Sequence, residues 1–170
     1  MMPKGKIAFI PILLFAGLTG CGLHSLYGGG ANSPLASVLR SVKVGPIAGQ
    51  SGWLVRNKLV DRLGESGGGP PAYRLDVTLD DNITSLGIRG DRAATYERRT
   101  LRARYQLVRA ATGTVVLDAT AGSDAGIDIV SSEYATVAAE QTALENLADT
   151  VADQIVARLA LYAARTKPGQ

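Results

Sequence analysis

Two stretches of this chain alternate strictly between apolar and polar residues, a period of two that predicts strands with one face in a core and one in water. In the first stretch, Tyr73, Leu75, Val77 and Leu79 are separated by Arg74, Asp76, Thr78 and Asp80. In the second, Leu101, Ala103, Tyr105 and Leu107 interleave with Arg102, Arg104 and Gln106. A tight turn at Thr112-Gly113 then leads into a third apolar run from Val115 to Ala119. Sequential strands with short connections pair antiparallel, so we expect a three-stranded meander.

The segments on either side of this meander predict one more strand and two helices. Residues 36–44 carry three valines with basic residues between them, which predicts a first strand. Ser51 is expected to cap a helix over residues 52–63, and residues 132–165 form a long helical pattern. The order strand, helix, strand, strand, strand, helix predicts a single α+β domain over residues 36–165. In this domain two helices pack on one face of a four-stranded, mostly antiparallel sheet.

The N-terminus has the three parts of a secretory signal peptide. Two lysines precede an apolar run from Ile7 to Leu18, and small residues then lead into Cys21, the only cysteine of the chain. The run is shorter than the roughly 20 apolar residues that a membrane-spanning helix needs. A lone cysteine has no disulfide partner, so we interpret Cys21 as the acylated residue of a lipoprotein, against the alternative of a free thiol in a secreted protein.

This interpretation divides the chain into a signal peptide at residues 1–20, an acylated tether at 21–35, the domain and a tail at 166–170. The residue after Cys21 is Gly22. In the lipoproteins that this sequence resembles, an Asp at that position favours retention in the inner membrane. We therefore expect a protein of the outer membrane, held there by a lipid anchor.

Composition argues against nucleic-acid binding and against catalysis. Without the two lysines of the signal peptide, sixteen basic residues face fifteen acidic ones, so no basic footprint for nucleic acid remains. The only histidine, His24, lies in the expected tether, so neither a Cys–His or Ser–His pair nor a His-rich metal site can be assembled in the domain. We interpret the adjacent acids Asp80 and Asp81 as turn formers, not as paired catalytic carboxylates. We expect no enzyme, no metal and no cofactor.

Three features of the sequence occur together: a lipobox, Cys21-Gly22 followed by the aromatic-glycine pair Tyr27-Gly28, and the predicted element order in about 150 residues. In these features the chain resembles the LptE family, also called RlpB, of lipopolysaccharide-assembly lipoproteins. The resemblance covers most of the chain after Cys21. It implies a lipoprotein that plugs and supports the large outer-membrane β-barrel LptD, with its domain on the periplasmic side or within the barrel lumen. It also implies binding of lipopolysaccharide on its way to the cell surface.

Arginines are concentrated between the two alternating stretches and along the second one. They are Arg89, Arg92, Arg98, Arg99, Arg102 and Arg104. Guanidinium groups suit bidentate binding of phosphate, and lipopolysaccharide carries phosphates, so these six residues are the candidate ligand site. In the competing interpretation the strand face is merely solvated, and Arg102 and Arg104 pair with cross-strand acids such as Asp76 and Asp118.

Two other functions stay open on the sequence. A lipoprotein subunit of another envelope lipid-transport system would share the anchor and a small α+β domain, and co-purifying partners would distinguish it. A lipid-tethered periplasmic enzyme lacks a catalytic constellation and would need a deep pocket with perturbed carboxylates.

Overall fold

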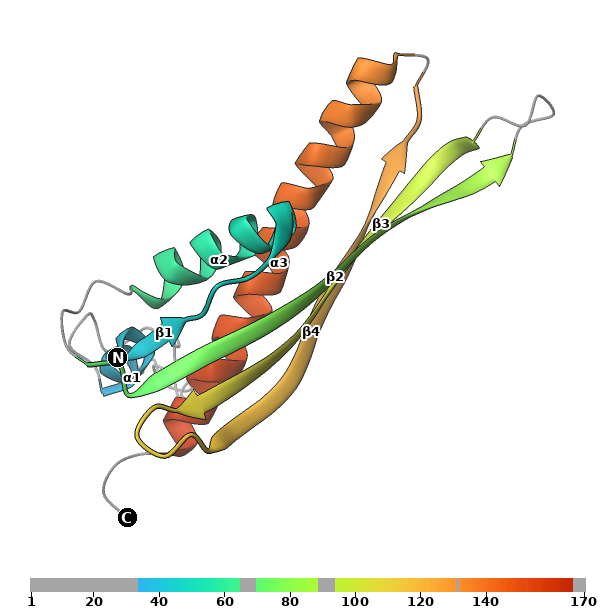
Figure 1. The fold of residues 1–170 in the computed structure, drawn as a ribbon. Coiled ribbons are helices and arrows are strands. Elements are labelled where there is room, and N and C mark those ends of the chain that lie inside the picture. The colour runs from blue at the N-terminus through green and yellow to red at the C-terminus, as the bar shows by residue number, and fades with distance from the viewer. Residues whose placement is uncertain (1–33, 65–69, 89–93, 131, 167–170) are drawn as a thin grey trace, which may run out of the picture.

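Helices cover one face of the sheet of this protein, and within the described part of the chain no helix covers the other face (Figure 1). The structure is a computed structural model that describes residues 34–64, 70–88, 94–130 and 132–166. Its elements are α1 (Pro34–Arg40), β1 (Val42–Val44), α2 (Gly49–Leu63), β2 (Tyr73–Ile88), β3 (Ala94–Arg109), β4 (Val115–Asp128) and α3 (Glu133–Arg165). The strand order is β1-β2-β3-β4, with β1 parallel to β2 and the other neighbours antiparallel. The predicted α+β class and the meander are confirmed.

The alternation in the sequence corresponds to the two faces of the sheet. Along β3, Leu101, Ala103, Tyr105 and Leu107 are at most 2% exposed, whereas Arg102 and Arg104 between them are exposed. The register carries this division to both neighbours, since Leu79 pairs with Ala103 and Ala103 pairs with Ala121. Burying each large apolar side chain of this face contributes about 1.5 to 3 kcal/mol, so the covered face holds the fold together.

The first predicted strand is wrong over most of its length. Residues Pro34–Arg40 form the helix α1, and only Val42–Val44 pair as β1, in parallel with β2. Proline is favoured at the first position of a helix, and Leu35 and Leu39 are spaced by one helical turn on the side that packs against the core. The structure therefore holds a helix, α1, that the predicted order lacks.

The helix α2 starts earlier than predicted and does not use Ser51 as its cap. It begins at Gly49, after Ala48, whose side chain offers no capping hydrogen bond. A Cβ atom at Gly52 would lie 2.7 Å from the carbonyl oxygen of Ile47, so the glycine lets the chain fold back tightly into the helix. The helix ends at Gly64 in the left-handed conformation, with φ of 64°.

The expected turn at Asp80 and Asp81 is also wrong, because β2 runs through both residues to Ile88. Asp80 pairs with Arg102 and Asp81 with Leu101 in the antiparallel register. Carboxylates disfavour strands in isolation, but here arginines of the neighbouring strand lie within reach of them. The β2–β3 hairpin is therefore long and projects beyond α2 (Figure 1).

The C-terminal helix α3 spans 33 residues and runs along the sheet for the whole length of the meander (Figure 1). Ser132 caps it, accepting a hydrogen bond from the backbone N–H of Ala135. Its buried stripe includes Leu144, Leu147, Val151, Ile155 and Leu159, as the helical pattern predicts. Among the described residues, no helix is both long and apolar enough to cross a membrane.

Candidate functional site

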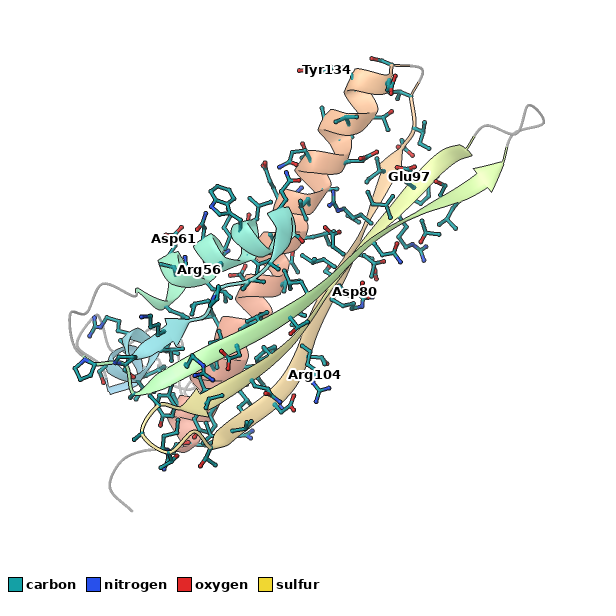
Figure 2. The ribbon with its side chains drawn as sticks, viewed as in Figure 1. Arg56, Asp61, Asp80, Glu97, Arg104 and Tyr134 are labelled. Carbon is teal, nitrogen blue, oxygen red and sulfur yellow. The ribbon has the colours of Figure 1, made fainter. Side chains whose placement is uncertain are left out.

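The uncovered side of the sheet, here called the open face, carries the charged side chains of β2, β3 and β4 that point away from α2 and α3. Figure 2 shows Arg104 on this side of the molecule and Arg56 on the helical side. The principal residues of the open face are Arg74, Asp76, Thr78, Asp80, Arg98, Thr100, Arg102, Arg104, Gln106, Asp118, Thr120, Gly122 and Asp124. Positive and negative groups alternate across it, so it is polar without a strong net charge.

Two arginines of β3 are held by aspartates of β4. Nη2 of Arg104 lies 3.0 Å from Oδ2 of Asp118, which also accepts a hydrogen bond of 2.9 Å from Gln106. The hydrogen bond from Arg104 and then that from Gln106 lower the pKa of Asp118. Because the Arg104 side chain remains 69% exposed, its guanidinium has free hydrogen-bond donors facing water.

Arg102 is held in the same way by a different acid. Its Nη2 lies 3.0 Å from Oδ1 of Asp124, which also accepts a hydrogen bond of 2.8 Å from the hydroxyl of Thr100. The hydrogen bond from Thr100 and then that from Arg102 lower the pKa of Asp124. The Arg102 side chain is 48% exposed, so this pair too is open to solvent and to ligands.

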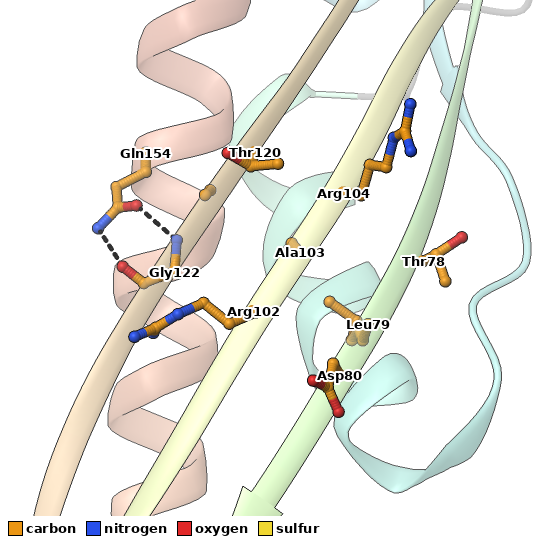
Figure 3. Close-up of a pocket in the computed structure, with 10 residues that line it drawn as sticks. Thr78, Leu79, Asp80, Arg102, Ala103, Arg104, Thr120, Gly122 and Gln154 are labelled. Carbon is orange, nitrogen blue, oxygen red and sulfur yellow. Dashed lines mark hydrogen bonds between the residues drawn. The ribbon is translucent and has the colours of Figure 1, made fainter.

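A glycine in β4 lets Arg102 lie flat across the sheet. A Cβ atom at Gly122 would lie 2.5 Å from Cδ of Arg102, so any other residue would push this side chain away. The backbone of Gly122 is held from the other side by Gln154 of α3, which donates to its carbonyl and accepts from its N–H (Figure 3). This amide pairs with the edge of β4 as a neighbouring strand would and fixes the position of Gly122.

A hollow of about 560 Å³ lies between these groups (Figure 3). Its polar lining includes Thr78, Asp80, Arg102, Arg104 and Thr120. Asp80 has no hydrogen bond or ion pair within the described residues. Two guanidinium groups, a free carboxylate and two hydroxyls suit a ligand that carries both anionic and hydroxyl groups.

The structure divides the six candidate arginines. Arg98, Arg102 and Arg104 share the open face, whereas Arg99 points toward α3. Arg99 donates two hydrogen bonds of 2.8 Å to Asp81 and one of 3.1 Å to the carbonyl oxygen of Glu140 in α3. Its side chain is 13% exposed, and the hydrogen bonds to Asp81 raise its pKa. Arg99 therefore fastens the sheet to α3.

Other predicted sites lie outside the described residues. They are Arg89, Arg92, the acylation site Cys21 and the ranges of the signal peptide, most of the tether and most of the tail. The cross-strand pairing that the competing interpretation expects is found for both strand arginines, since Arg104 pairs with Asp118 and Arg102 with Asp124. Asp76 instead pairs with Arg74 of its own strand. The described residues hold no cluster of His, Cys, Asp or Glu that would bind a metal ion.

The alternation in the sequence places Asp80 on the polar side with Arg74 and Thr78, but the prediction of a turn there ends the strand too early. Asp124 is the residue of the open face that the sequence analysis misses. Asp124 lies beyond the apolar run that marked the third strand, and only the register shows that it reaches Arg102. The strand length was therefore the missing information.

Comparison with known proteins gives a family and a fold. A family model described as LptE, lipopolysaccharide-assembly, matches residues 39–159, which is most of the described domain. A search of the curated proteins finds no match. A lipoprotein from Caulobacter crescentus CB15 is similar over 81% of this chain and 100% of its own, with 28% sequence identity and a TM-score of 0.67.

Two more distant lipoproteins share the fold. A minor lipoprotein from Acinetobacter baumannii is 14% identical over 71% of this chain and 90% of its own, with a TM-score of 0.58. The rare lipoprotein B from Shewanella oneidensis is 11% identical over 73% of this chain and 96% of its own, with a TM-score of 0.51. The extent of the family match decides the assignment: the chain belongs to the LptE family of lipopolysaccharide-assembly proteins.

Proposed function

We propose that this protein is an outer-membrane lipoprotein, anchored at Cys21, that supports an LptD-like β-barrel and binds lipopolysaccharide through the open face of its sheet. Membership of the LptE family supports the assembly role. The observation that carries the ligand site is the open face itself, where Arg98, Arg102 and Arg104 stand exposed on one strand.

The chemistry of these arginines fits a phosphate-bearing ligand. Arg98 has no hydrogen bond or ion pair within the described residues, although its charge helps to lower the pKa of Asp124, so all its hydrogen-bond donors are available to an anion. Arg102 and Arg104 are paired with aspartates in water-exposed positions, where such pairs contribute little stability. A phosphate group can therefore displace an aspartate from either guanidinium at small cost, because it offers the same bidentate geometry.

The open face also suits a partner with a wet interior. Its side chains are charged or hydroxylated, and the pairs on it satisfy one another before any partner binds. A polar interface of this kind tolerates bridging water, which a lumen filled with water would supply. A polar, hydrated surface therefore suits both the proposed barrel partner and the proposed ligand.

The partner is tested by purifying the tagged, lipidated protein from outer membranes in mild detergent and identifying the co-purifying proteins by mass. We expect one large barrel protein in near equal amount. Recovery of an inner-membrane transporter instead would contradict the proposal and favour a lipoprotein of another lipid-transport system.

The ligand site is tested by charge reversal. Arg98→Glu with Arg104→Glu is expected to weaken capture of purified lipopolysaccharide by about tenfold or more, because each lost contact is a charge-assisted hydrogen bond. The control is Arg56→Glu on α2, a single charge reversal on the helical side (Figure 2). A second variant, Arg89→Glu with Arg92→Glu, tests the remaining candidates. Equal capture by both reversal variants and the parent protein would reject these arginines as the site.

A further inference from the structure

Basic residues gather at the end of the domain where α1 begins, well away from the far end of the β2–β3 hairpin (Figure 1). We call them the basic end: Arg40, Lys43, Arg74, Arg109 and Arg165. Tyr73 connects several of them. It pairs with Arg109 in the sheet, and its N–H donates to the carbonyl oxygen of Ser41, the residue after Arg40.

Contacts from the helices complete this end. The ring of Tyr162 packs edge-on against Tyr73, with 6.4 Å between the ring centroids, and Arg165 follows one helical turn later at the end of α3. The side chain of Arg40 passes Gly64 at the end of α2, where a Cβ would lie 3.5 Å from its Cγ. Residues from α1, β1, β2, β3 and α3 therefore meet at one end of the domain.

The charges of the basic end are largely uncompensated. Within the described residues, the side chains of Arg40, Lys43, Arg109 and Arg165 have no hydrogen bond or ion pair. Lys43 lies directly across from Arg74 in the parallel pairing, and like charges in such positions repel. Of the five residues of the basic end, Arg74 alone has a carboxylate partner among the described residues, Asp76. An anionic surface would relieve this repulsion.

The far end of the domain has the opposite character. Its described residues carry the carboxylates of Asp128, Glu133 and Glu140, against one exposed arginine, Arg98. The α3 helix, with 33 residues at 1.5 Å each, separates the two ends by about 50 Å. Over the described residues, the charge therefore differs between the two ends of the long axis, and an anionic surface would orient this part of the chain with the basic end inward.

We propose that the basic end lies against an anionic phospholipid surface, that of the membrane which holds the lipid on Cys21. This inference rests on the proposed anchor. Twelve residues lie between Cys21 and Pro34 at the start of α1, and the thirteen Cα–Cα steps across them reach at most about 45 Å when fully extended. The anchor thus draws this end toward the headgroups, where each basic residue strengthens binding about fivefold. The acyl chains attach the protein, and the basic end sets its orientation.

The test measures headgroup binding separately from lipid insertion. The chain from residue 21 onward, carrying Cys21→Ser, is mixed with vesicles of phosphatidylcholine alone or of phosphatidylcholine and phosphatidylglycerol in equal amounts, and bound protein is recovered by flotation. We expect binding to the anionic vesicles only, decreasing as salt is added. Lys43→Glu with Arg109→Glu should lower it at least about tenfold, because two attractions become repulsions.

The control is Arg56→Glu on α2, a charge reversal outside both the basic end and the open face, which should leave vesicle binding unchanged. Circular dichroism and thermal unfolding verify that each variant is folded. Equal binding to both kinds of vesicle, or an unchanged partition of the Lys43→Glu, Arg109→Glu variant, would overturn the proposal. The lipidated form of this variant should still co-purify the barrel partner. Loss of that partner with vesicle binding intact would make the basic end a protein contact, whereas failure of the parent to recover a barrel would count against the proposed function alone.

Discussion

The two faces of the sheet use the same pair of residue types in different ways. On the covered face, Arg99 and Asp81 have side chains that are 13% and 20% exposed, and Arg99 also reaches the backbone of α3. On the open face, Arg104 and Asp118 lie at a similar distance but are 69% and 39% exposed. The presence of an ion pair therefore does not show whether it stabilises the fold or is available to a ligand. The exposure of the pair distinguishes the two roles, because water competes with the open pair and is largely excluded from the covered one.

The two faces should differ most in how much a substitution lowers the free energy of unfolding, and two adjacent residues of β3 test this. Leu101 is fully buried in the core, so Leu101→Ala should lower the free energy of unfolding by about 2 to 5 kcal/mol, through lost burial and the cavity left behind. Arg102→Ala, one residue further along, should leave stability close to that of the parent. Urea denaturation of the two variants measures this contrast. Similar losses in both would mean that the open face also carries the fold.

The second comparison concerns the two arginine pairs. Arg99→Ala leaves the mostly buried Asp81 carboxylate without its guanidinium and frees the carbonyl of Glu140, so we expect a loss of about 1 to 3 kcal/mol. Arg99→Lys should recover only part of it, because an ammonium group does not make the bidentate contact. Arg104→Ala is the control on the open face and should change thermal stability little. A smaller loss from Arg99→Ala than from Arg104→Ala would reverse the assignment of the two pairs.

The division into faces was predictable from the sequence because side chains alternate with a period of two along a strand. That rule also separates Arg99 from its neighbours, since its odd number places it with Leu101 and Ala103 on the core side. Grouping Arg98 and Arg99 as one charged site ignored the alternation. Counting charged residues along a strand thus overestimates the number that share one face, because alternate residues point in opposite directions.

Other parts of the structure depended on information that local patterns do not contain. Valines at the end of residues 36–44 suggested a strand throughout, but the segment is helical up to Arg40 because Leu35 and Leu39 pack against the core. Asp80 and Asp81 looked like a turn, since adjacent acids favour turns when no partner is near. The ion-pair partner of Asp81, Arg99, and the residue opposite Asp80, Arg102, lie about twenty residues away, and only the register brings them together. In both segments, contacts between residues distant in the sequence outweighed the local secondary-structure preference.

A smaller loss of stability is expected from substituting Gly122, the glycine of β4 that leaves room for Arg102. Gly122→Ala should displace the side chain of Arg102 from its position across β4 and cost about 1 kcal/mol, since the new Cβ would also lie 3.0 Å from the carbonyl oxygen of Leu101. The double variant Gly122→Ala, Arg102→Ala should recover part of this loss, because the flexible neighbour is gone. Thermal unfolding of the three variants tests this coupling. Purely additive losses would show that Arg102 does not depend on Gly122.

The smallest expected effect concerns acid, and it extends the comparison to the charges between the two helices on the covered side. Asp149 of α3 lies 2.9 Å from Arg62 and 3.1 Å from Lys58 of α2, and the hydrogen bond from Arg62 is the main cause that lowers its pKa. A carboxyl group with a lower pKa in the folded state stabilises the fold fully above its unfolded pKa of about 3.9. This contribution is lost as the pH falls through the folded pKa.

Since the Asp149 side chain is 39% exposed, solvent screening limits its share to less than about 1 kcal/mol. Asp149→Asn should therefore lower stability slightly near neutral pH and reduce the loss of stability in acid, as measured by urea denaturation from about pH 6 down to about pH 3. Asp118→Asn removes a carboxylate of the open face and is the matched comparison. If Asp149→Asn leaves the acid profile of the parent unchanged, the helix pair is as well screened as the open face, and the difference between the two sides rests on apolar burial and on Arg99 alone.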